Sequence, residues 1–249
     1  METPLDQAIH KLKVDVLQMM HLAQDAVKKA VASLLEHDAA KARAVIEADR
    51  EINDYECRVD AESLKILALH HPVAKDLRFL VGSMRMLVNI ERLGDEAVNI
   101  AERVLVLISE SRQPIHGNLR HLAGLALDLV RESIRCYMDL DTKAALQVIE
   151  QNAAALDLNV RVFREVTGDM IRESQTVDLA VQQSFVAHSL KRICDQCANI
   201  AESTLFIRQG IDFKHKQCGT ASGLSTSDLP ESAPDSPGEN AAPKPQQDA

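Results

Sequence analysis

Acidic side chains recur at helical spacing along two stretches of this sequence. Residues three, four or seven positions apart share one face of a helix. By that rule the first stretch aligns three carboxylates, those of Asp49, Glu56 and Asp60. The second stretch aligns Glu91 with Asp95, and apolar residues flank both acidic faces. Because carboxylate oxygens are preferred ligands of many metal ions, these residues form a candidate site for Fe, Zn, Mn or Mg.

The second acidic stretch has a close copy a hundred residues later. Residues 91–102 are ERLGDEAVNIAE and residues 191–202 are KRICDQCANIAE, with six identical positions. Asp195 corresponds to Asp95 and is a further candidate ligand, whereas Lys191 stands where the first copy has Glu91. We therefore expect the first copy to be the better metal site. The recurrence of Arg, Asp, Asn and Glu in register indicates an internal repeat.

Other interpretations of these residues remain open. The chain has 37 acidic residues, so carboxylates at helical spacing arise often, and arginines such as Arg92 would neutralise them as ion pairs. A ferritin-like di-iron site is disfavoured, because no histidine has a glutamate three residues before it. Cys194 and Cys197 align with Gly94 and Ala97 of the first copy, which favours buried packing thiols over a redox or zinc pair.

Long helices must position these residues. Apolar side chains recur every three or four positions over six stretches, and Trp is absent. The expected helices cover residues 5–34, 39–70, 73–111, 117–139, 142–173 and 176–209. The repeat divides them into two units, at residues 1–112 and 113–213, and short turns make neighbouring helices antiparallel. The expected fold is therefore all-α, with two antiparallel three-helix bundles related by a pseudo-twofold axis.

The composition excludes several classes of protein. A net charge of −9 argues against a nucleic-acid partner. No stretch approaches the roughly 18 apolar residues of a membrane helix. Five cysteines, an odd number, suggest free thiols in a reducing compartment, so we expect a cytoplasmic protein. Residues 214–249 are rich in Ser, Pro, Gly and Ala and are expected to be a disordered tail.

Three stretches of the chain resemble the PhoU family of bacterial phosphate-transport accessory proteins. They are HPVAKDLRFLVGSMRMLVNIERLGDEAVNIAE (residues 71–102), VIEADREINDYE (residues 45–56) and KRICDQCANIAE (residues 191–202). The resemblance extends over about residues 5–210 and implies a pair of three-helix bundles. Some relatives bind metal clusters through an E/D-x-x-x-D motif, which maps here onto Glu91 and Asp95.

The resemblance also implies a function without enzymatic activity. Family members link a phosphate ABC transporter to a sensor histidine kinase at the inner face of the membrane. They keep the phosphate-starvation genes silent when phosphate is plentiful. We expect this chain to be such an adapter, self-associating as a dimer or larger assembly and reaching the membrane only through its partners.

Two further expectations concern this function. A metal-buffering helical bundle with no signalling role is the alternative from another class of protein, and only the acidic stretches support it. For the adapter, three arginines at seven-residue spacing share one helix face and are a candidate contact surface: Arg78, Arg85 and Arg92. Pairing of these arginines with the acids of the preceding helix is the other interpretation.

Overall fold

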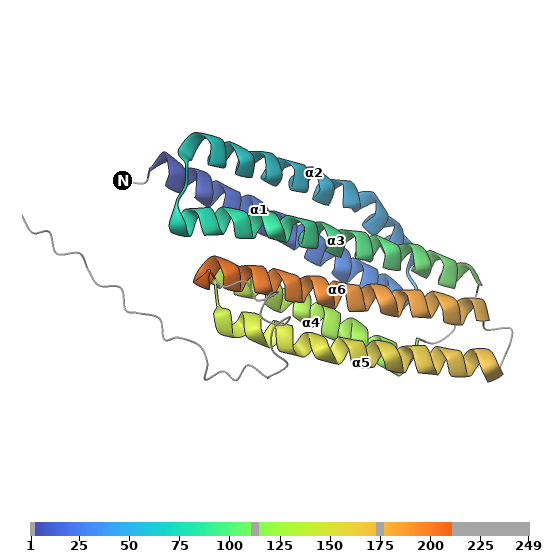
Figure 1. Ribbon diagram of the computed structural model, residues 1–249. Helices are drawn as coiled ribbons and strands as arrows, with labels where there is room; N and C mark the ends of the chain where they lie inside the picture. Colours follow the sequence, from blue (N-terminus) through green and yellow to red (C-terminus); the bar gives the residue numbers. More distant parts are fainter. Residues whose placement is uncertain (1–2, 111–114, 173–176, 211–249) are drawn as a thin grey trace, which may run out of the picture.

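Six long helices form a bundle in the part of the chain that the structure describes. The computed structural model describes residues 3–110, 115–172 and 177–210, in which the helices lie side by side (Figure 1). They are α1 (Pro4–Glu36), α2 (Ala39–His70), α3 (Ala74–Glu110), α4 (Gly117–Asp139), α5 (Thr142–Arg172) and α6 (Val177–Gln209). The predicted all-α fold is confirmed. The expected tail at residues 214–249 and the expected boundary at residues 112–113 lie outside the described residues.

The turn between the first two helices is the same in both repeats. α1 ends at His37 with φ of 55°, and α4 ends at Leu140 with φ of 50°, both in the left-handed region. An aspartate then caps the next helix. Asp38 Oδ1 accepts the backbone N–H groups two and three residues later, at 2.9 and 3.1 Å. Asp141 Oδ1 accepts the equivalent pair at 2.9 and 3.1 Å, so short-range chemistry sets one antiparallel helix pair in each half.

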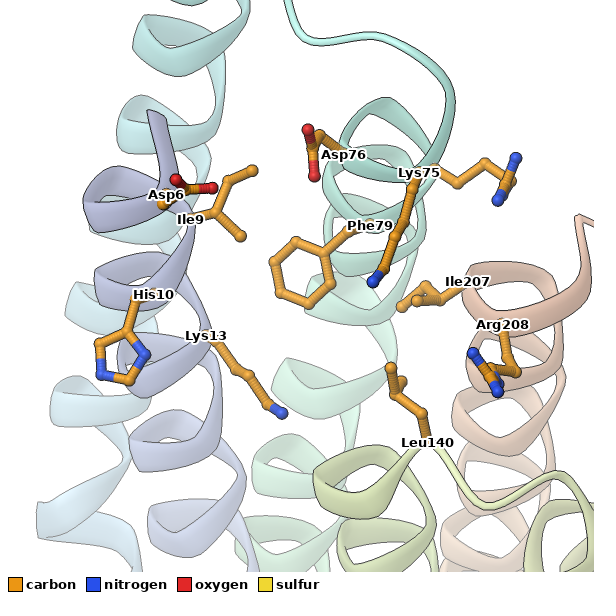
Figure 2. A pocket seen from close by; sticks show the side chains of 11 residues that line it. Asp6, Ile9, His10, Lys13, Lys75, Asp76, Phe79, Leu140, Ile207 and Arg208 are labelled. Carbon is orange, nitrogen blue, oxygen red and sulfur yellow. The ribbon is translucent and has the colours of Figure 1, made fainter. Parts of the chain in front are cut away.

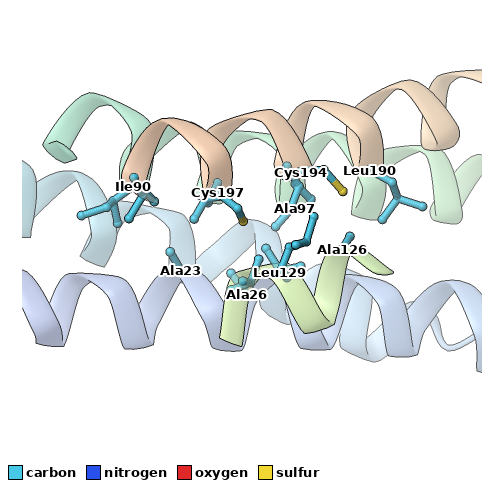
Figure 3. Packing of buried hydrophobic residues seen from close by; sticks show 14 of the residues in the cluster. Ala23, Ala26, Ile90, Ala97, Ala126, Leu129, Leu190, Cys194 and Cys197 are labelled. Carbon is cyan, nitrogen blue, oxygen red and sulfur yellow. The ribbon is translucent and has the colours of Figure 1, made fainter. Parts of the chain in front are cut away.

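The buried apolar residues form one cluster with members on all six helices. Figure 3 shows part of it, where Ala23 of α1, Ile90 of α3, Leu129 of α4 and Cys197 of α6 are packed. Contacts join α1 to α4 and α3 to α6, in addition to those within each three-helix repeat. The two repeats therefore share a core and stabilise one another.

The paired cysteines belong to this core. Cys194 and Cys197 are free thiols with fully buried side chains. Burial raises the pKa of the Cys194 thiol to about 12, and burial also raises the pKa of Cys197 well above its usual value. Such thiols stay protonated and are poor nucleophiles and metal ligands. The prediction that they serve as packing residues is confirmed.

The two repeated dodecamers meet where α3 packs against α6. Gly82 of α3 lies against Ile207 of α6, and Glu96 of α3 pairs with Arg192 of α6. Moving from Gly82 to Glu96 along α3 corresponds to moving back from Ile207 to Arg192 along α6, so the two helices are antiparallel. This register places residues 91–97 of α3 opposite residues 191–197 of α6 in reverse order, so the first halves of the two dodecamers lie against each other. The copies face each other across the pseudo-twofold axis.

Among the described residues, none of the helices combines the length and the apolar character that crossing a membrane requires.

Candidate functional site

Four of the predicted metal ligands come together between α2 and α3. Asp49 and Glu56 lie on α2, and Glu91 and Asp95 lie on α3, on the faces where these helices contact one another. The charge of Asp95 is close enough to Asp49 to alter the titration of Asp49, and Glu56 and Asp95 both act on Glu91. Because the two helices are antiparallel, the acidic faces predicted from spacing become one group of facing carboxylates, called here the acidic cluster.

A glycine allows the two helices of the acidic cluster to approach closely. A Cβ atom on Gly94 would lie 2.9 Å from Ile52 Cδ1 and 3.3 Å from Asp49 Oδ1. The first distance is shorter than van der Waals contact permits, so a side chain at this position would require Ile52 to move its terminal methyl group. The same close approach carries the Asp49 carboxylate into the seam between the helices, where water reaches it less.

Mutual repulsion and burial shift the titration of Glu91. Burial is the largest cause, followed by the charges of Asp95 and Glu56, and together they raise the pKa of Glu91 to about 7. The neighbouring guanidinium of Arg92 opposes this shift. Near neutral pH the acidic cluster therefore takes up a proton or attracts a cation.

One carboxylate oxygen of Asp49 receives no hydrogen bond from the described part of the chain. Asn53 Nδ2 donates to Asp49 Oδ2 at 3.0 Å, whereas Oδ1 is buried and accepts no hydrogen bond from the described residues. Burial, and then the charge of Asp95, raise the pKa of Asp49 above its usual value. A buried carboxylate oxygen with no donor is costly, so it is a favourable position for a cation or a water molecule.

The types of ligand in the acidic cluster suit a metal ion, but their present positions do not form a coordination shell. Across the described ranges, no group of three or more His, Cys, Asp or Glu side chains is placed to hold an ion. Ion binding would require the carboxylates to converge by changing rotamers. The bare Oδ1 of Asp49 and the raised pKa of Glu91 are the features that fit such an ion.

The second repeat holds its own cation at the equivalent position. Lys191 and Asn152 occupy the places of Glu91 and Asp49. Lys191 Nζ donates to Asp195 Oδ2 at 2.6 Å, and Asn152 Nδ2 donates to Asp195 Oδ1 at 3.1 Å. Both oxygens of Asp195 are therefore engaged by the chain. The structure thus places Asp195 apart from the other predicted ligands, in a repeat where an ammonium group supplies the positive charge.

Asp60 also lies outside the acidic cluster. It follows Glu56 by about one turn of α2, and its side chain is exposed. The charges that shift Glu91 are those of Asp95, Glu56 and Arg92, and Asp60 is not among them. Spacing on α2 placed Asp60 on the acidic face, but in the structure its side chain is exposed, outside the group of carboxylates that act on Glu91.

The three arginines at seven-residue spacing do not present one common surface. The Arg85 guanidinium lies 4.5 Å from the centre of the Phe206 ring on α6. Arg78 lines a pocket at one end of the bundle, with its side chain partly buried. Arg92 is exposed next to Glu91. Arg85 and Arg78 therefore lie towards the second repeat, whereas Arg92 lies beside Glu91.

An ion pair that the sequence interpretation missed joins the two repeats. Glu96 is only 2% exposed, and its Oε1 accepts a hydrogen bond from Arg192 Nη1 at 2.9 Å. Its Oε2 accepts a weaker one from Asn99 Nδ2 at 3.3 Å. The sequence did contain a signal, because Glu96 lies three residues after Leu93 and four before Ile100, on the apolar arc of α3.

Both repeats match a known family of sequences. The family model described as "PhoU domain" matches residues 16–104 and residues 119–204. The phosphate-specific transport system accessory protein PhoU homolog of Aquifex aeolicus is 30% identical over 212 residues, which cover 85% of this chain and 96% of the relative. The homolog of Pseudomonas putida is 29% identical over 208 residues, covering 83% of this chain and 81% of the relative.

Solved structures share the arrangement of helices. The crystal structure of PhoU from Pseudomonas aeruginosa superposes with a TM-score of 0.80 at 28% identity, covering 83% of this chain and 99% of that one. The phosphate transport system regulatory protein PhoU from Streptococcus pneumoniae gives a TM-score of 0.77 at 22% identity, covering 84% of this chain and 98% of that one. The paired three-helix bundles are therefore the fold of these proteins too.

Proposed function

The chain belongs to the PhoU family, and on this basis we propose that it is a non-enzymatic regulator of phosphate homeostasis. It couples a phosphate ABC transporter to a sensor histidine kinase and represses the phosphate-starvation response when phosphate is plentiful. The match of the family model to both repeats carries this proposal, since the relatives are named as accessory proteins of phosphate-specific transport. The protein acts in the cytoplasm and reaches the inner membrane through its partners.

Self-association is part of the proposal. α5 exposes three large apolar side chains at helical spacing, Leu156, Val160 and Phe163, with exposed fractions of 54%, 39% and 62%. The residues at the corresponding positions of α2 include Asn53 and Asp60, so the repeat has replaced polar side chains by apolar ones here. Neighbouring exposed apolar side chains are a common feature of protein contact surfaces. A second copy of the chain is the occupant we propose.

The regulatory role predicts a phenotype on deletion. A strain lacking the gene should express phosphate-starvation genes in phosphate-rich medium, because the kinase no longer receives the signal that phosphate is plentiful. A reporter fused to a starvation promoter measures this, and the intact gene supplied in trans should restore silence. Normal repression in the deletion strain would contradict the proposal. Metal-dependent growth defects without a change in the reporter would favour the metal-buffering alternative.

A bound metal ion is the second part of the proposal. Glu91 and Asp95 of α3, with Asp49 and Glu56 of α2, would hold the ion, and it would supply the positive charge that this acidic cluster lacks. The comparison between the repeats supports this, because the second repeat meets the same need with the ammonium group of Lys191. The ion would also join α2 to α3, so that binding strengthens the contact between these helices.

The metal proposal predicts stoichiometric iron, zinc, manganese or magnesium in protein purified without chelator or affinity-tag metal. Asp95→Asn should abolish this content in elemental analysis, whereas the matched Asp195→Asn should retain it. Because bound carboxylates must be ionised and the pKa of Glu91 is about 7, affinity should fall as pH drops below neutrality. Protein that is metal-free and equally stable with and without added metal would show that the acidic cluster is structural only.

A further inference from the structure

A pocket of about 490 Å³ opens at one end of the bundle. Its walls come from the start of α1, the start of α3, the turn after α4 and the last turn of α6 (Figure 2). The pocket residues of α3 end at Phe79, about three turns before Glu91, so the acidic cluster is a separate site. Size alone makes the pocket a candidate for a small molecule, since ligand sites commonly enclose about 300–1,000 Å³.

Four lysine and arginine side chains line this pocket, although the chain as a whole is acidic. They come from three helices: Lys13 of α1, Lys75 and Arg78 of α3, and Arg208 of α6. Figure 2 shows the amino group of Lys75 beside the Phe79 ring and that of Lys13 reaching into the space between the helices. Residues from such distant parts of the sequence meet only through the packing of α1, α3 and α6.

Within the described part of the chain, few of these cations have partners. Lys13 Nζ donates to the backbone carbonyl of Met138 at 3.0 Å. Arg78 Nε is buried and makes no hydrogen bond with the described residues. A buried guanidinium nitrogen without an acceptor is unfavourable, and an anion in the pocket would provide that acceptor.

Two carboxylates lower the positive charge of the pocket without cancelling it. Asp6 is committed to the start of α1, where its Oδ2 accepts hydrogen bonds from Thr3 N and Thr3 Oγ1 at 2.9 and 2.8 Å. Asp76 is the other acid of the lining. Four cations against two carboxylates leave a formal charge of +2, with His10 neutral.

The rest of the lining is apolar. Ile9, Phe79, Leu140 and Ile207 contribute side chains to the pocket. A ligand that fills it would therefore place a charged group among the lysines and arginines and an uncharged part against this apolar surface. A small inorganic anion would satisfy only the first of these two regions.

We propose that this pocket binds a phosphate-bearing anion, either inorganic phosphate or a phosphate ester with an apolar or aromatic body. A phosphate group carries about −1.5 to −2 charges near pH 7, which balances the +2 of the lining. Arginine and lysine are the side chains that bind phosphate oxygens most strongly in proteins. The proposal depends on the charges and shape of the pocket and not on the regulatory role proposed above.

Isothermal titration calorimetry of the full-length protein, at constant ionic strength, tests the proposal with inorganic phosphate, AMP and adenosine as probes. Saturable binding of phosphate or AMP is expected, with no binding of adenosine. Comparable affinities for phosphate and AMP would identify the free ion as the ligand, and tighter binding of AMP would identify an ester. Lys75→Gln combined with Arg208→Gln should weaken binding about tenfold or more, because two charge-assisted contacts are lost.

Two further variants make the test decisive. Lys75 and Arg208 are both exposed, so replacing them should not unfold the protein, and a thermal melt of the Lys75→Gln, Arg208→Gln variant checks this. Lys75→Arg combined with Arg208→Lys keeps the charges and should retain binding. Lys29→Gln combined with Arg120→Gln also removes one lysine and one arginine charge, but from exposed positions outside the pocket. This control variant should leave binding unchanged. The absence of saturable phosphate and AMP binding, or equal losses in the pocket variant and this control, would overturn the proposal.

Discussion

Replacing Arg192 by alanine is expected to lower the free energy of unfolding by about 3 kcal/mol, the lower end of the range for breaking a buried ion pair. The substitution leaves the Glu96 carboxylate buried between α3 and α6, with only the weak hydrogen bond from Asn99. The lower end applies because the Arg192 side chain is 46% exposed, so water replaces part of its interaction. For a chain of this size the melting temperature should fall by about 6–12 °C.

The repeat supplies the controls for this experiment. Arg92 occupies the equivalent position in the first copy, and the residue equivalent to Glu96 is Gln196, which is uncharged. Arg92→Ala should therefore cost less than about 1 kcal/mol, as for an exposed charge. Adding Glu96→Gln to Arg192→Ala should recover most of the lost stability, because no charge is then left buried. Equal effects of Arg192→Ala and Arg92→Ala would show that the ion pair does not stabilise the contact between repeats.

Replacing Gly82 by alanine is expected to destabilise the protein by about 1–3 kcal/mol, as overpacking of a helix contact does. A Cβ atom at this position would lie 2.3 Å from Ile207 Cγ1 and 2.8 Å from Ile207 Cδ1. Ile207 is β-branched and 4% exposed in the last turn of α6, so it has little freedom to move away. Denaturant unfolding of the purified variant measures the change.

The sign of the Gly82 effect distinguishes crowding from helix propensity. Gly124 lies inside α4, and among the described residues no other side chain comes within 4 Å of the place that a methyl group would take. Gly124→Ala should therefore stabilise the protein by about 0.5–1 kcal/mol through helix propensity alone. In an Ile207→Ala background, the methyl group at position 82 fills the vacated space, so Gly82→Ala should become stabilising. A Gly82→Ala effect that stays unfavourable in this background would show that the contact with Ile207 is not its cause.

The sequence by itself determined the helices, their order and the repeat. Apolar side chains at three- and four-residue spacing and capping residues such as Asp38 and Asp141 act within a few residues of the chain. Short-range effects of this kind can be identified from the sequence, so the helix bounds and the all-α fold were predicted. The acidic faces of α2 and α3 were found for the same reason, as was the packing role of Cys194 and Cys197.

The tertiary structure decided which helix faces meet, because a helix with apolar residues on several sides does not specify its neighbours. Packing of α2 on α3 selected Glu56 and Asp49 for the acidic cluster and left Asp60 outside it. Packing of α3 on α6 placed the repeated dodecamers opposite one another and buried Glu96 against Arg192. The end pocket was equally hidden from sequence, since its cations lie on separate helices and converge only when the core of the bundle forms.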